Sequence, residues 1–347
     1  MSTNWGVIGA GYISNRALIP AIQRARDARV LAVASLDEQR ARATADRFAI
    51  PRVYHDYAAL LEDPDVQVVY IALPNHLHRE WTICAAQHGR HVLCEKPLAM
   101  SVAECDEMIQ ACRQANVMLM EAVMYRFHPR MQALKAMLDA GEAGELRFLH
   151  SAFSFPFESP ANYRAFPQYG GGALLDIGSY CVNASRWLPD LEPAGVQARA
   201  SYSQNGVDIN SSAILHYGNA GLTAHIQCSF AAAEHQVIEA VGSQAAITAP
   251  LAFSAWVDDT TSLLIQKGGN TEERSFSPAD PYQLMVEHFS DCVQGRAEPL
   301  YPAEDGRATM RVLEMIKGHF PLTNMPETAR LTENHENMSK DRRGFEQ

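Results

Sequence analysis

The N-terminal half of the sequence repeats one unit, a short apolar strand followed by a helix, and this repetition constrains the fold more than any other feature. The first unit joins an apolar run at residues 5–8, the turn Gly9-Ala10-Gly11 and a helix expected over 16–26. Further apolar strands are expected at 30–34, 66–72 and 91–94, with helices at 38–48 and 76–88. Repeated strand–helix–strand units predict an α/β fold with a parallel, doubly wound sheet.

The glycine turn after the first strand is suited to binding a phosphate group. Gly9 permits the tight turn, and Gly11 lets a ligand approach the backbone closely. Tyr12 and Ile13 follow in the turn as further candidate cofactor contacts, and the start of the next helix offers N–H groups and the positive end of the helix dipole. Ser14 is small enough to serve at the third position of the motif, where close helix packing is needed. This turn therefore predicts a dinucleotide site.

Polar side chains cluster where three of these strands end. Ser35 follows the second strand, Asn75 and His76 follow the third, and Glu95-Lys96-Pro97 follows the fourth. Ligands of doubly wound sheets bind beyond the carboxyl ends of the strands, so these side chains are candidate ligand contacts. Pro97 favours an extended conformation at Lys96 and permits a cis Lys96–Pro97 bond.

From Glu145 onward the apolar residues repeat with a period near two, which is typical of strands with one buried face. The clearest alternation covers residues 222–230, and further strands are expected at 212–217, 236–241 and 244–248. Helices are expected at 129–140 and 304–318. We predict a first domain at 1–122, an α+β domain with a large, mostly antiparallel open sheet at 123–322, and a polar tail at 323–347.

A glycine-rich segment in the second half predicts another cluster of polar side chains. If a helix begins at Gly170-Gly171-Gly172, then Asp176 and Tyr180 lie on one face, with Asn183 one turn further. Neighbouring leucine, isoleucine and valine residues indicate that this helix is largely buried, and buried polar groups need partners. We therefore expect the three side chains to point together.

The composition argues against several classes of function. The 29 lysines and arginines against 40 aspartates and glutamates give a formal net charge of 29 − 40 = −11, which disfavours nucleic-acid binding. No apolar run approaches the ~18–20 residues of a membrane span, and the first residues carry no targeting pattern. No metal-binding motif is present. The seven cysteines form no C-x-x-C pair, so we expect free thiols and a cytoplasmic protein.

These motifs together resemble the glucose-fructose oxidoreductase and inositol dehydrogenase (Gfo/Idh/MocA) family of nicotinamide-dependent sugar oxidoreductases. The resemblance covers roughly residues 4–320, and its most specific motif is Glu95-Lys96-Pro97 between the glycine turn and the segment 170–180. It implies that the first domain is a Rossmann domain that binds NAD(P), that the second domain covers the active site and mediates oligomers, and that Lys96 is catalytic. It also implies cofactor contacts from Leu73, Asn75, His78, Glu95, Lys96 and Arg126.

Two features favour the branch that contains D-xylose (aldose) dehydrogenases and dimeric dihydrodiol dehydrogenases. The inositol dehydrogenase branch has histidine where this chain has Tyr180. The segment 124–129 and the pair Tyr163-Arg164 are also similar to the aldose dehydrogenase branch. The resemblance therefore implies a carbohydrate substrate that contacts Lys96, Tyr163, Arg164, Asp176 and Tyr180.

The oxidation of an alcohol requires a group that takes a proton. Hydride leaves carbon for the nicotinamide while the hydroxyl proton is removed, so a positioned acid/base side chain is needed. We assign the proton transfer to Tyr180 and an electrostatic role to Lys96, and the opposite assignment stays open. Asp176 is expected to orient the sugar hydroxyl or the lysine through a charge-assisted hydrogen bond.

The end of the second strand indicates which nicotinamide cofactor is used. NAD-binding sheets place an acidic residue there for the ribose, whereas this chain has Ser35. Ser35, together with Arg40 one turn into the next helix, can hold a 2′-phosphate, which favours NADP. NAD is the alternative, because Leu36 stands where NADP-preferring relatives often carry arginine and Asp37 can bind ribose.

We expect an enzyme that oxidises an aldose at C1 to a lactone, or that reduces a keto or anhydro sugar. A trans-dihydrodiol dehydrogenase would use the same catalytic residues, and the aromatic side chains of Phe153, Phe155, Phe157 and Tyr163 could stack on either substrate. A catalytically inactive NADP-binding regulator is the alternative of another class, although such a protein would be expected to have lost the catalytic side chains. The alternating sheet leaves a second face to cover, which predicts a homodimer.

Overall fold

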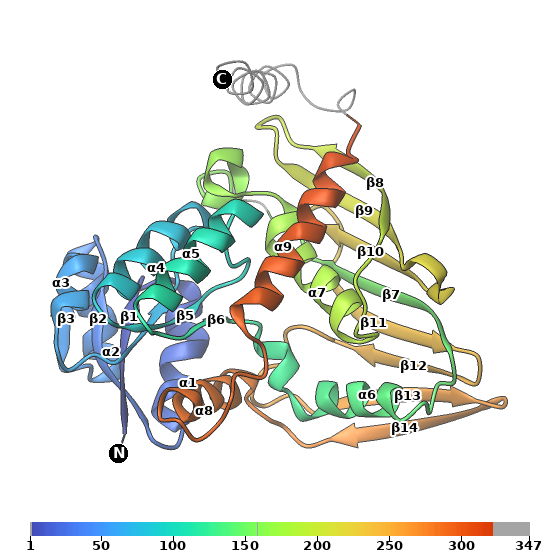
Figure 1. Ribbon diagram of the computed structural model, residues 1–347, viewed down its shortest axis with the longest axis horizontal. Helices are drawn as coiled ribbons and strands as arrows, with labels where there is room; N and C mark the ends of the chain where they lie inside the picture. Colours follow the sequence, from blue (N-terminus) through green and yellow to red (C-terminus); the bar gives the residue numbers. More distant parts are fainter. Residues whose placement is uncertain (1, 158, 322–347) are drawn as a thin grey trace.

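The computed structural model describes residues 2–157 and 159–321, which form two sheets with helices packed against them (Figure 1). The tail expected at 323–347 lies outside the described residues. The first sheet has six parallel strands in the order β3-β2-β1-β4-β5-β6, which confirms the predicted doubly wound α/β fold. Its strands are β1 (Thr3–Ile8), β2 (Ala28–Ala34), β3 (Arg52–Tyr54), β4 (Val68–Ile71), β5 (His91–Cys94) and β6 (Leu119–Glu121).

Helices cover both faces of this sheet. They are α1 (Ile19–Arg24), α2 (Glu38–Phe48), α3 (Tyr57–Glu62), α4 (His78–Gln87) and α5 (Val102–Gln114), with short helical turns η1 (Ser14–Leu18) and η2 (Asn75–Leu77). On one side α4 packs on α5, and on the other α1 packs on α8 (Pro281–Val293) from the C-terminal part of the chain (Figure 1). The indole nitrogen of Trp5 donates to Ser290 Oγ of α8 at 3.2 Å. A helix that is distant in sequence, α8, therefore packs with the helices that cover the first sheet.

The helix expected over 16–26 is divided into η1, a π-helical turn, and α1. Pro20 has no backbone N–H and therefore cannot donate the regular helical hydrogen bond, and the wider turn lies just before it. The Ser14 hydroxyl donates to the carbonyl oxygen of Gly9 at 2.5 Å. This hydrogen bond fixes the start of the helical segment against the glycine turn.

The two glycines of that turn have different roles in the fold. Gly9 has φ +101°, and a Cβ built there would lie 2.4 Å from the carbonyl oxygen of Ala72, beyond the end of β4. None of the described atoms lies within 4 Å of a Cβ built at Gly11. Gly9 is therefore required for the packing of the turn, whereas the backbone at Gly11 faces open space.

The second sheet has eight strands in the order β14-β13-β12-β11-β7-β10-β9-β8. Neighbouring strands are antiparallel except for β7 and β10, which are parallel. This confirms the predicted large, mostly antiparallel sheet. The strands are β7 (Leu146–Ser154), β8 (Gly195–Tyr202), β9 (Asp208–His216), β10 (Thr223–Ser229), β11 (His235–Gly242), β12 (Ala245–Pro250), β13 (Thr261–Lys267) and β14 (Asn270–Phe276).

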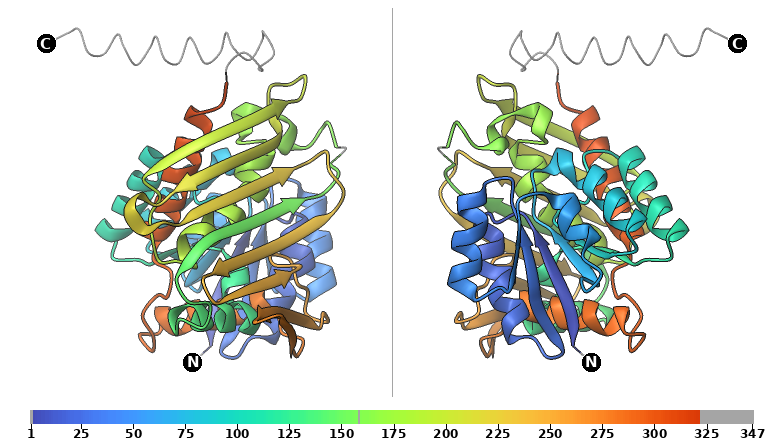
Figure 2. Two further views of the ribbon diagram at one scale, coloured as in Figure 1. Left: turned by 90° about the vertical axis from the view of Figure 1, so that its right-hand side faces the viewer. Right: turned by 90° about the vertical axis from the view of Figure 1, so that its left-hand side faces the viewer.

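One face of this sheet is covered and the other is open. The covering elements are α6 (Pro129–Asp139), η6 (Leu174–Gly178), α7 (Ser179–Trp187) and α9 (Ala303–Gly318). In the left view of Figure 2 the opposite face is turned toward the viewer, with its strands uncovered. Sequence reasoning did not indicate β14, because every residue of it before Phe276 is exposed and no alternation marks it. Among the described residues, no helix is long and apolar enough to cross a membrane.

The contrast between Gly9 and Gly11 gives a matched pair of variants. Gly9→Ala places a side chain in a left-handed conformation and against backbone, so we expect it to lower the free energy of unfolding by about 1–3 kcal/mol. Gly11→Ala is expected to change it by less than about 0.5 kcal/mol, since the site is open. Urea unfolding followed by circular dichroism measures both values, and equal effects of the two variants would contradict this account.

Candidate active site

Lys96 follows β5 in a turn that contains a cis Lys96–Pro97 peptide bond, as the sequence allowed. The turn is held by His78, which is fully buried at the start of α4. The two ring nitrogens of His78 lie 2.9 Å from the carbonyl oxygens of Pro97 and Leu73. Because both nitrogens contact the protein backbone, His78 ties the Lys96 turn to the end of β4 and is not placed for the direct cofactor contact expected of it.

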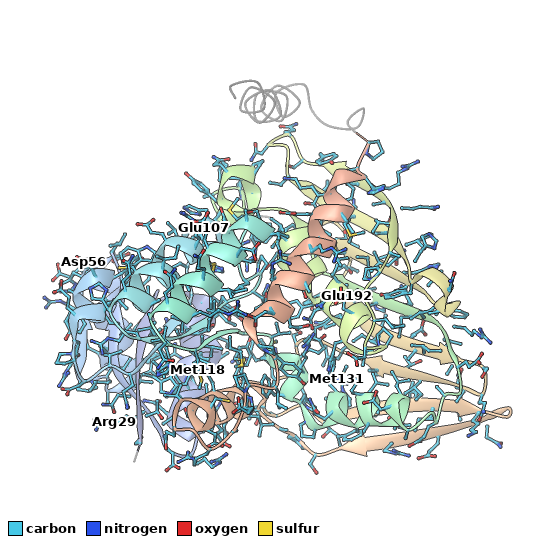
Figure 3. The ribbon with its side chains drawn as sticks, viewed as in Figure 1. Arg29, Asp56, Glu107, Met118, Met131 and Glu192 are labelled. Atoms are coloured by element: carbon cyan, nitrogen blue, oxygen red, sulfur yellow. The ribbon has the colours of Figure 1, made fainter. Side chains whose placement is uncertain are left out.

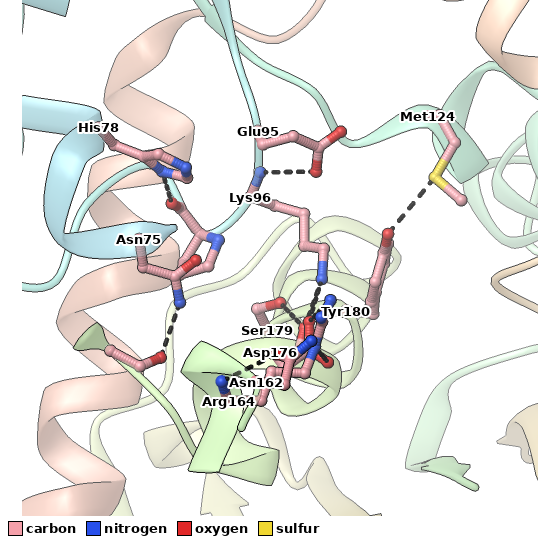
Figure 4. Close-up of polar contacts among 12 residues, drawn as sticks. Asn75, His78, Glu95, Lys96, Met124, Asn162, Arg164, Asp176, Ser179 and Tyr180 are labelled. Carbon is pink, nitrogen blue, oxygen red and sulfur yellow. Dashed lines mark hydrogen bonds and ion pairs between the residues drawn. The ribbon is translucent and has the colours of Figure 1, made fainter. Parts of the chain in front are cut away.

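Asp176 joins this turn to the second domain. Its Oδ1 accepts a hydrogen bond from Lys96 Nζ at 2.8 Å, and its backbone carbonyl accepts from the same nitrogen at 2.9 Å. Arg164 Nε donates to Asp176 Oδ2 at 2.7 Å. Figure 4 shows the lysine and the arginine converging on this one carboxylate. The structure therefore brings together three of the predicted site residues, from three separate segments of the chain.

The charge of Asp176 follows from its surroundings. The side chains of Asp176 and Lys96 are only 6% and 11% exposed. Burial on its own would raise the pKa of Asp176, but the positive charges of Arg164 and Lys96 outweigh it and hold the pKa of this carboxyl below its usual range. Asp176 is therefore ionised throughout the neutral pH range and is shared between two cations.

Tyr180 lies beside this network, but its hydroxyl does not reach Lys96. The hydroxyl donates to Met124 Sδ at 3.6 Å, and Lys96 Nζ lies 4.7 Å from the centre of the phenol ring (Figure 4). Burial, with smaller contributions from Tyr282, Glu95 and Asp176, raises the pKa of Tyr180 well above its ordinary value. The tyrosine is therefore neutral, and its ring face receives the lysine ammonium group.

Aromatic side chains form a wall behind Tyr180. The centre of its ring lies 5.8 Å from that of Phe153 and 5.6 Å from that of Phe253. Phe155 packs against Phe153, and Phe157 follows it along the chain at a ring distance of 6.4 Å from Phe155. The predicted aromatic residues of β7 and the segment after it are thus contiguous with the Lys96 cluster.

The segment that carries Arg164 also contacts the first domain. Tyr163 lies beneath the Arg164 guanidinium, whose carbon is 4.8 Å from the ring centre. Further along, the carbonyl oxygen of Gly170 accepts from Asn75 Nδ2 at 2.8 Å, and the rings of His76 and Tyr169 lie 4.8 Å apart. Asn75 is therefore engaged with the second domain at the end of β4.

The predicted cofactor contacts at the end of β2 lie together. Ser35 Oγ accepts from the backbone N–H of Asp37 at 3.2 Å, and Asp37 caps α2 by accepting from the backbone N–H of Arg40 at 3.0 Å. The side chains of Arg40 and Leu36 are exposed. In the glycine turn, Tyr12 is 75% exposed, whereas Ile13 packs against the core.

Glu95 is buried next to Lys96 and has partners within the protein. It accepts hydrogen bonds from the Tyr70 hydroxyl and, at 3.2 Å, from the backbone N–H of Lys96. Burial raises the pKa of Glu95, which the charge of Lys96 partly offsets. The structure therefore gives Glu95 a role in holding the strand end, and the cofactor contact expected of it stays a prediction.

Two sequence expectations are not met. Asn183 does not point to the Lys96 cluster, because its Oδ1 accepts from the Tyr125 hydroxyl and from Arg126 Nε, both at 2.7 Å. Arg126, expected to contact the cofactor, is only 1% exposed. It pairs with Asp305 at 2.7 Å and packs on the rings of Trp187 and Tyr301. Both side chains belong to a buried contact with α9, which the helical spacing at 176–183 cannot reveal.

Arg186 of α7 extends this buried contact. It pairs with Asp305 of α9 at 3.1 Å and with Glu192, which is labelled in Figure 3. Sequence reasoning also missed Met124, the acceptor of the Tyr180 hydroxyl. A methionine in an apolar segment is most often a core residue, so the sequence carries no signal for this role.

Comparison with known proteins agrees with these features. Residues 3–123 match the model of an oxidoreductase family with an NAD-binding Rossmann fold, and residues 131–248 match the GFO/IDH/MocA C-terminal domain. A D-xylose 1-dehydrogenase (NADP(+)) from Haloferax volcanii is 37% identical over 314 residues, which cover 90% of this chain and 95% of the relative. A trans-1,2-dihydrobenzene-1,2-diol dehydrogenase from Xenopus tropicalis is 37% identical over 62% of this chain and 66% of its own length.

Two solved structures are similar to this chain over most of its length. An aldose-aldose oxidoreductase from Caulobacter crescentus, complexed with glycerol, superposes with a TM-score of 0.86 at 27% identity, covering 92% of this chain and 97% of its own. A 3-ketoreductase from Actinomadura kijaniata, in complex with NADP and TDP-benzene, gives a TM-score of 0.86 at 29% identity over 92% of this chain and 98% of its own. The chain therefore belongs to the Gfo/Idh/MocA family of oxidoreductases.

Proposed function

We propose that this protein is an NADP-dependent dehydrogenase that oxidises an aldose at C1 to a lactone. The observation that carries the proposal is the position of the Lys96–Asp176–Arg164 network, which lies beside Tyr180 where the strand ends of the first sheet face the second domain. The relative from Haloferax volcanii, named as an NADP-dependent D-xylose 1-dehydrogenase, supports this substrate class.

The residues at the glycine turn fit a dinucleotide. The open space beside Gly11 is what a pyrophosphate needs to approach the backbone, and the N–H groups at the start of η1 lie next to it. Ser35 and the exposed guanidinium of Arg40 would hold the 2′-phosphate. When bound, the nicotinamide accepts hydride from the substrate carbon or returns it.

The side chains of the site would bind the reacting oxygen and transfer its proton. Lys96 uses two N–H groups on Asp176, which leaves the third for the oxygen of the reacting hydroxyl. Within residues 2–157 and 159–321, the Tyr180 hydroxyl bonds only to a thioether, a weak acceptor, so a sugar oxygen can replace Met124 as its partner. In the reducing direction, the neutral Tyr180 hydroxyl gives its proton to the substrate oxygen as hydride reaches the substrate carbon, and the positive charge of Lys96 stabilises the negative charge that develops on that oxygen. Oxidation is the reverse of this step, in which the Tyr180 phenolate takes the hydroxyl proton. The reverse assignment, with Lys96 as the base, is tested below.

Two other functions are possible for a chain of this fold, a dihydrodiol dehydrogenase and a cofactor-binding regulator. The wall formed by Phe153, Phe253 and Tyr180 would also suit an aromatic diol, as in the dihydrodiol dehydrogenase from Xenopus tropicalis. A cofactor-binding regulator without catalysis is disfavoured, because Lys96 and Asp176 are in contact and Tyr180 lies beside them. Reduction of NADP⁺, followed by absorbance across a panel of aldoses, cyclitols and diols, distinguishes the three.

We further propose that the open face of the second sheet pairs with that of a second copy. Phe148, on the central strand β7, is 48% exposed and lies beside Thr223 and Val241 of the neighbouring strands. The same face carries both a basic side chain, Arg199, and an acidic one, Glu239, so two copies can present complementary charges.

All seven cysteines are free, which supports a location in the reducing cytoplasm.

The catalytic assignment predicts losses of turnover without loss of cofactor binding. Lys96→Met and Tyr180→Phe are each expected to lower kcat about 10²–10⁴-fold, because each removes a group that acts on the reacting oxygen. NADPH affinity, measured by fluorescence titration, should stay within about threefold. Tyr54→Phe, on the distant edge strand β3, removes a hydroxyl outside the site and serves as the control. If both variants kept near-normal turnover, the assignment would be wrong. If only Lys96→Met lost activity, lysine would be the base.

The cofactor assignment predicts a selective effect at Arg40. Arg40→Ala removes the cation proposed for the 2′-phosphate, so kcat/KM for NADP is expected to fall about 10–100-fold while the value for NAD stays unchanged. Arg42→Ala removes another exposed arginine of α2, one that pairs with Glu38, and is the matched control. Steady-state kinetics with both cofactors checks this. A wild-type preference for NAD would refute the roles given to Ser35 and Arg40.

The proposed dimer predicts that Phe148→Asp is monomeric in sedimentation velocity, because a charge would then be buried at the centre of the interface. Leu300→Asp changes a leucine that is even more exposed and lies outside both sheets, and it should leave the dimer intact. A wild-type protein that sediments as a monomer at micromolar concentration would contradict the proposal.

A further inference from the structure

A buried carboxylate outside the proposed site contacts the turn that carries Lys96. Glu121 ends β6 and is 6% exposed. Its Oε1 accepts a hydrogen bond from the backbone N–H of Leu98 at 2.8 Å. Cys94, the last residue of β5, pairs with Glu121 across the sheet. The glutamate therefore reaches from the end of one strand to the turn that leaves its neighbour, two residues beyond Lys96.

The helix α9 closes over this contact. Figure 1 shows the first turns of α9 beside the end of β6, and the two elements are in contact. A Cβ built at Gly306, inside α9, would lie 3.0 Å from Glu121 Oε2 and 3.1 Å from Leu98 Cδ2. Glycine destabilises the interior of a helix relative to alanine. Close packing of α9 on Glu121 and Leu98 gives a reason for glycine at this position.

Charged groups from several elements face Glu121. They are Asp305 of α9, Arg126 before α6 and Arg186 of α7, together with the Cys105 thiol of α5. Burial and the charge of Asp305 raise the pKa of Glu121 to about 7, against the opposing effects of the Leu98 N–H and the two arginines. Burial also raises the pKa of Cys105, so this thiol stays neutral. Glu121 is therefore a buried group whose charge changes near neutral pH.

We propose that ionised Glu121 is a positioning residue for Lys96, fixing the turn between Lys96 and Leu98 under the packing of α9. The inference rests on the proposed function in that Lys96 acts on the substrate. A carboxylate is a stronger acceptor for the Leu98 N–H than a neutral carboxyl group is. Protonation of Glu121 therefore loosens the turn on the Leu98 side, while the His78 contact on the Pro97 carbonyl is retained.

This role predicts that kcat falls at the acid side of its pH profile, and we call this fall the acid limb. The group whose protonation causes it, Glu121, does not contact the substrate. Turnover is expected to decline below about pH 7, where Glu121 becomes protonated, and to reach its plateau above it. The limb should appear in kcat, because the position of the lysine matters after the substrate is bound.

Glu121→Gln and Glu121→Leu separate positioning from a merely structural role. Glutamine is a neutral acceptor for the Leu98 N–H, as protonated Glu121 is, and cannot titrate, so its kcat should lack the acid limb and stay at every pH near the lower value that the wild type shows below about pH 7. Leucine leaves a buried N–H without its partner, so kcat should fall about tenfold or more at every pH while KM for the sugar stays within about threefold. The inference is overturned if the glutamine variant keeps the wild-type acid limb or if the leucine variant keeps wild-type kcat.

Hydrogen exchange in the full-length protein without substrate gives a readout that needs no catalysis. Above about pH 7, where Glu121 is ionised, amides of residues 95–100 should exchange faster in Glu121→Leu than in the wild type, and at an intermediate rate in Glu121→Gln. If the wild-type protein oxidised no compound of the panel, the proposed function would fail. The exchange test would still show whether Glu121 holds the turn at Leu98. Should Glu121→Leu not fold, Gly306→Ala presses a methyl group against Glu121 and Leu98. It should speed the same exchange, and unchanged exchange would overturn the inference.

Discussion

The ion contact at Asp176 is the interaction on which the proposed site depends. One buried carboxylate from the second domain receives Lys96 from the first domain and Arg164 from the segment before η6. Burying a carboxylate is costly unless it is paired and hydrogen-bonded, and two cations together offset that cost. Because Arg164 and Lys96 depress the pKa of Asp176 below its unfolded value, this contribution to stability is present at neutral pH. It is lost only as the pH falls through the folded pKa.

Support for this contact comes from several layers around it. His78 and Glu95 hold the Lys96 turn from the first domain, and Asn75 joins the end of β4 to the segment at Gly170. Behind Tyr180, aromatic packing keeps the phenol buried and neutral. The proposed chemistry needs two groups side by side: Lys96, which has one N–H left for the substrate, and the neutral hydroxyl group of Tyr180.

Local sequence patterns were enough to predict the glycine turn and four of the six strands of the first sheet, but not the short edge strands β3 and β6. The contact between Lys96 and Asp176 was one of two roles expected for Asp176, and it came from the family resemblance and the expected chemistry. The glycine turn is readable because a positive φ at Gly9 leaves little choice of residue, and buried parallel strands are continuous apolar runs. Asn183 and Arg126 were misplaced because their partners, Tyr125 and Asp305, come from other segments of the chain. The role of Glu121 depends on α9, nearly 200 residues away, and no spacing along the sequence encodes it.

The central claim is that the charge of Asp176 places Lys96 for hydride transfer. The most direct measurement is the single-turnover rate of NADP⁺ reduction by a saturating aldose in Asp176→Asn, compared with the wild type at the same pH. The account predicts that this rate falls about 10²-fold or more while NADPH affinity is unchanged, because the amide cannot hold the ammonium group as the carboxylate does. A wild-type rate in Asp176→Asn would contradict it.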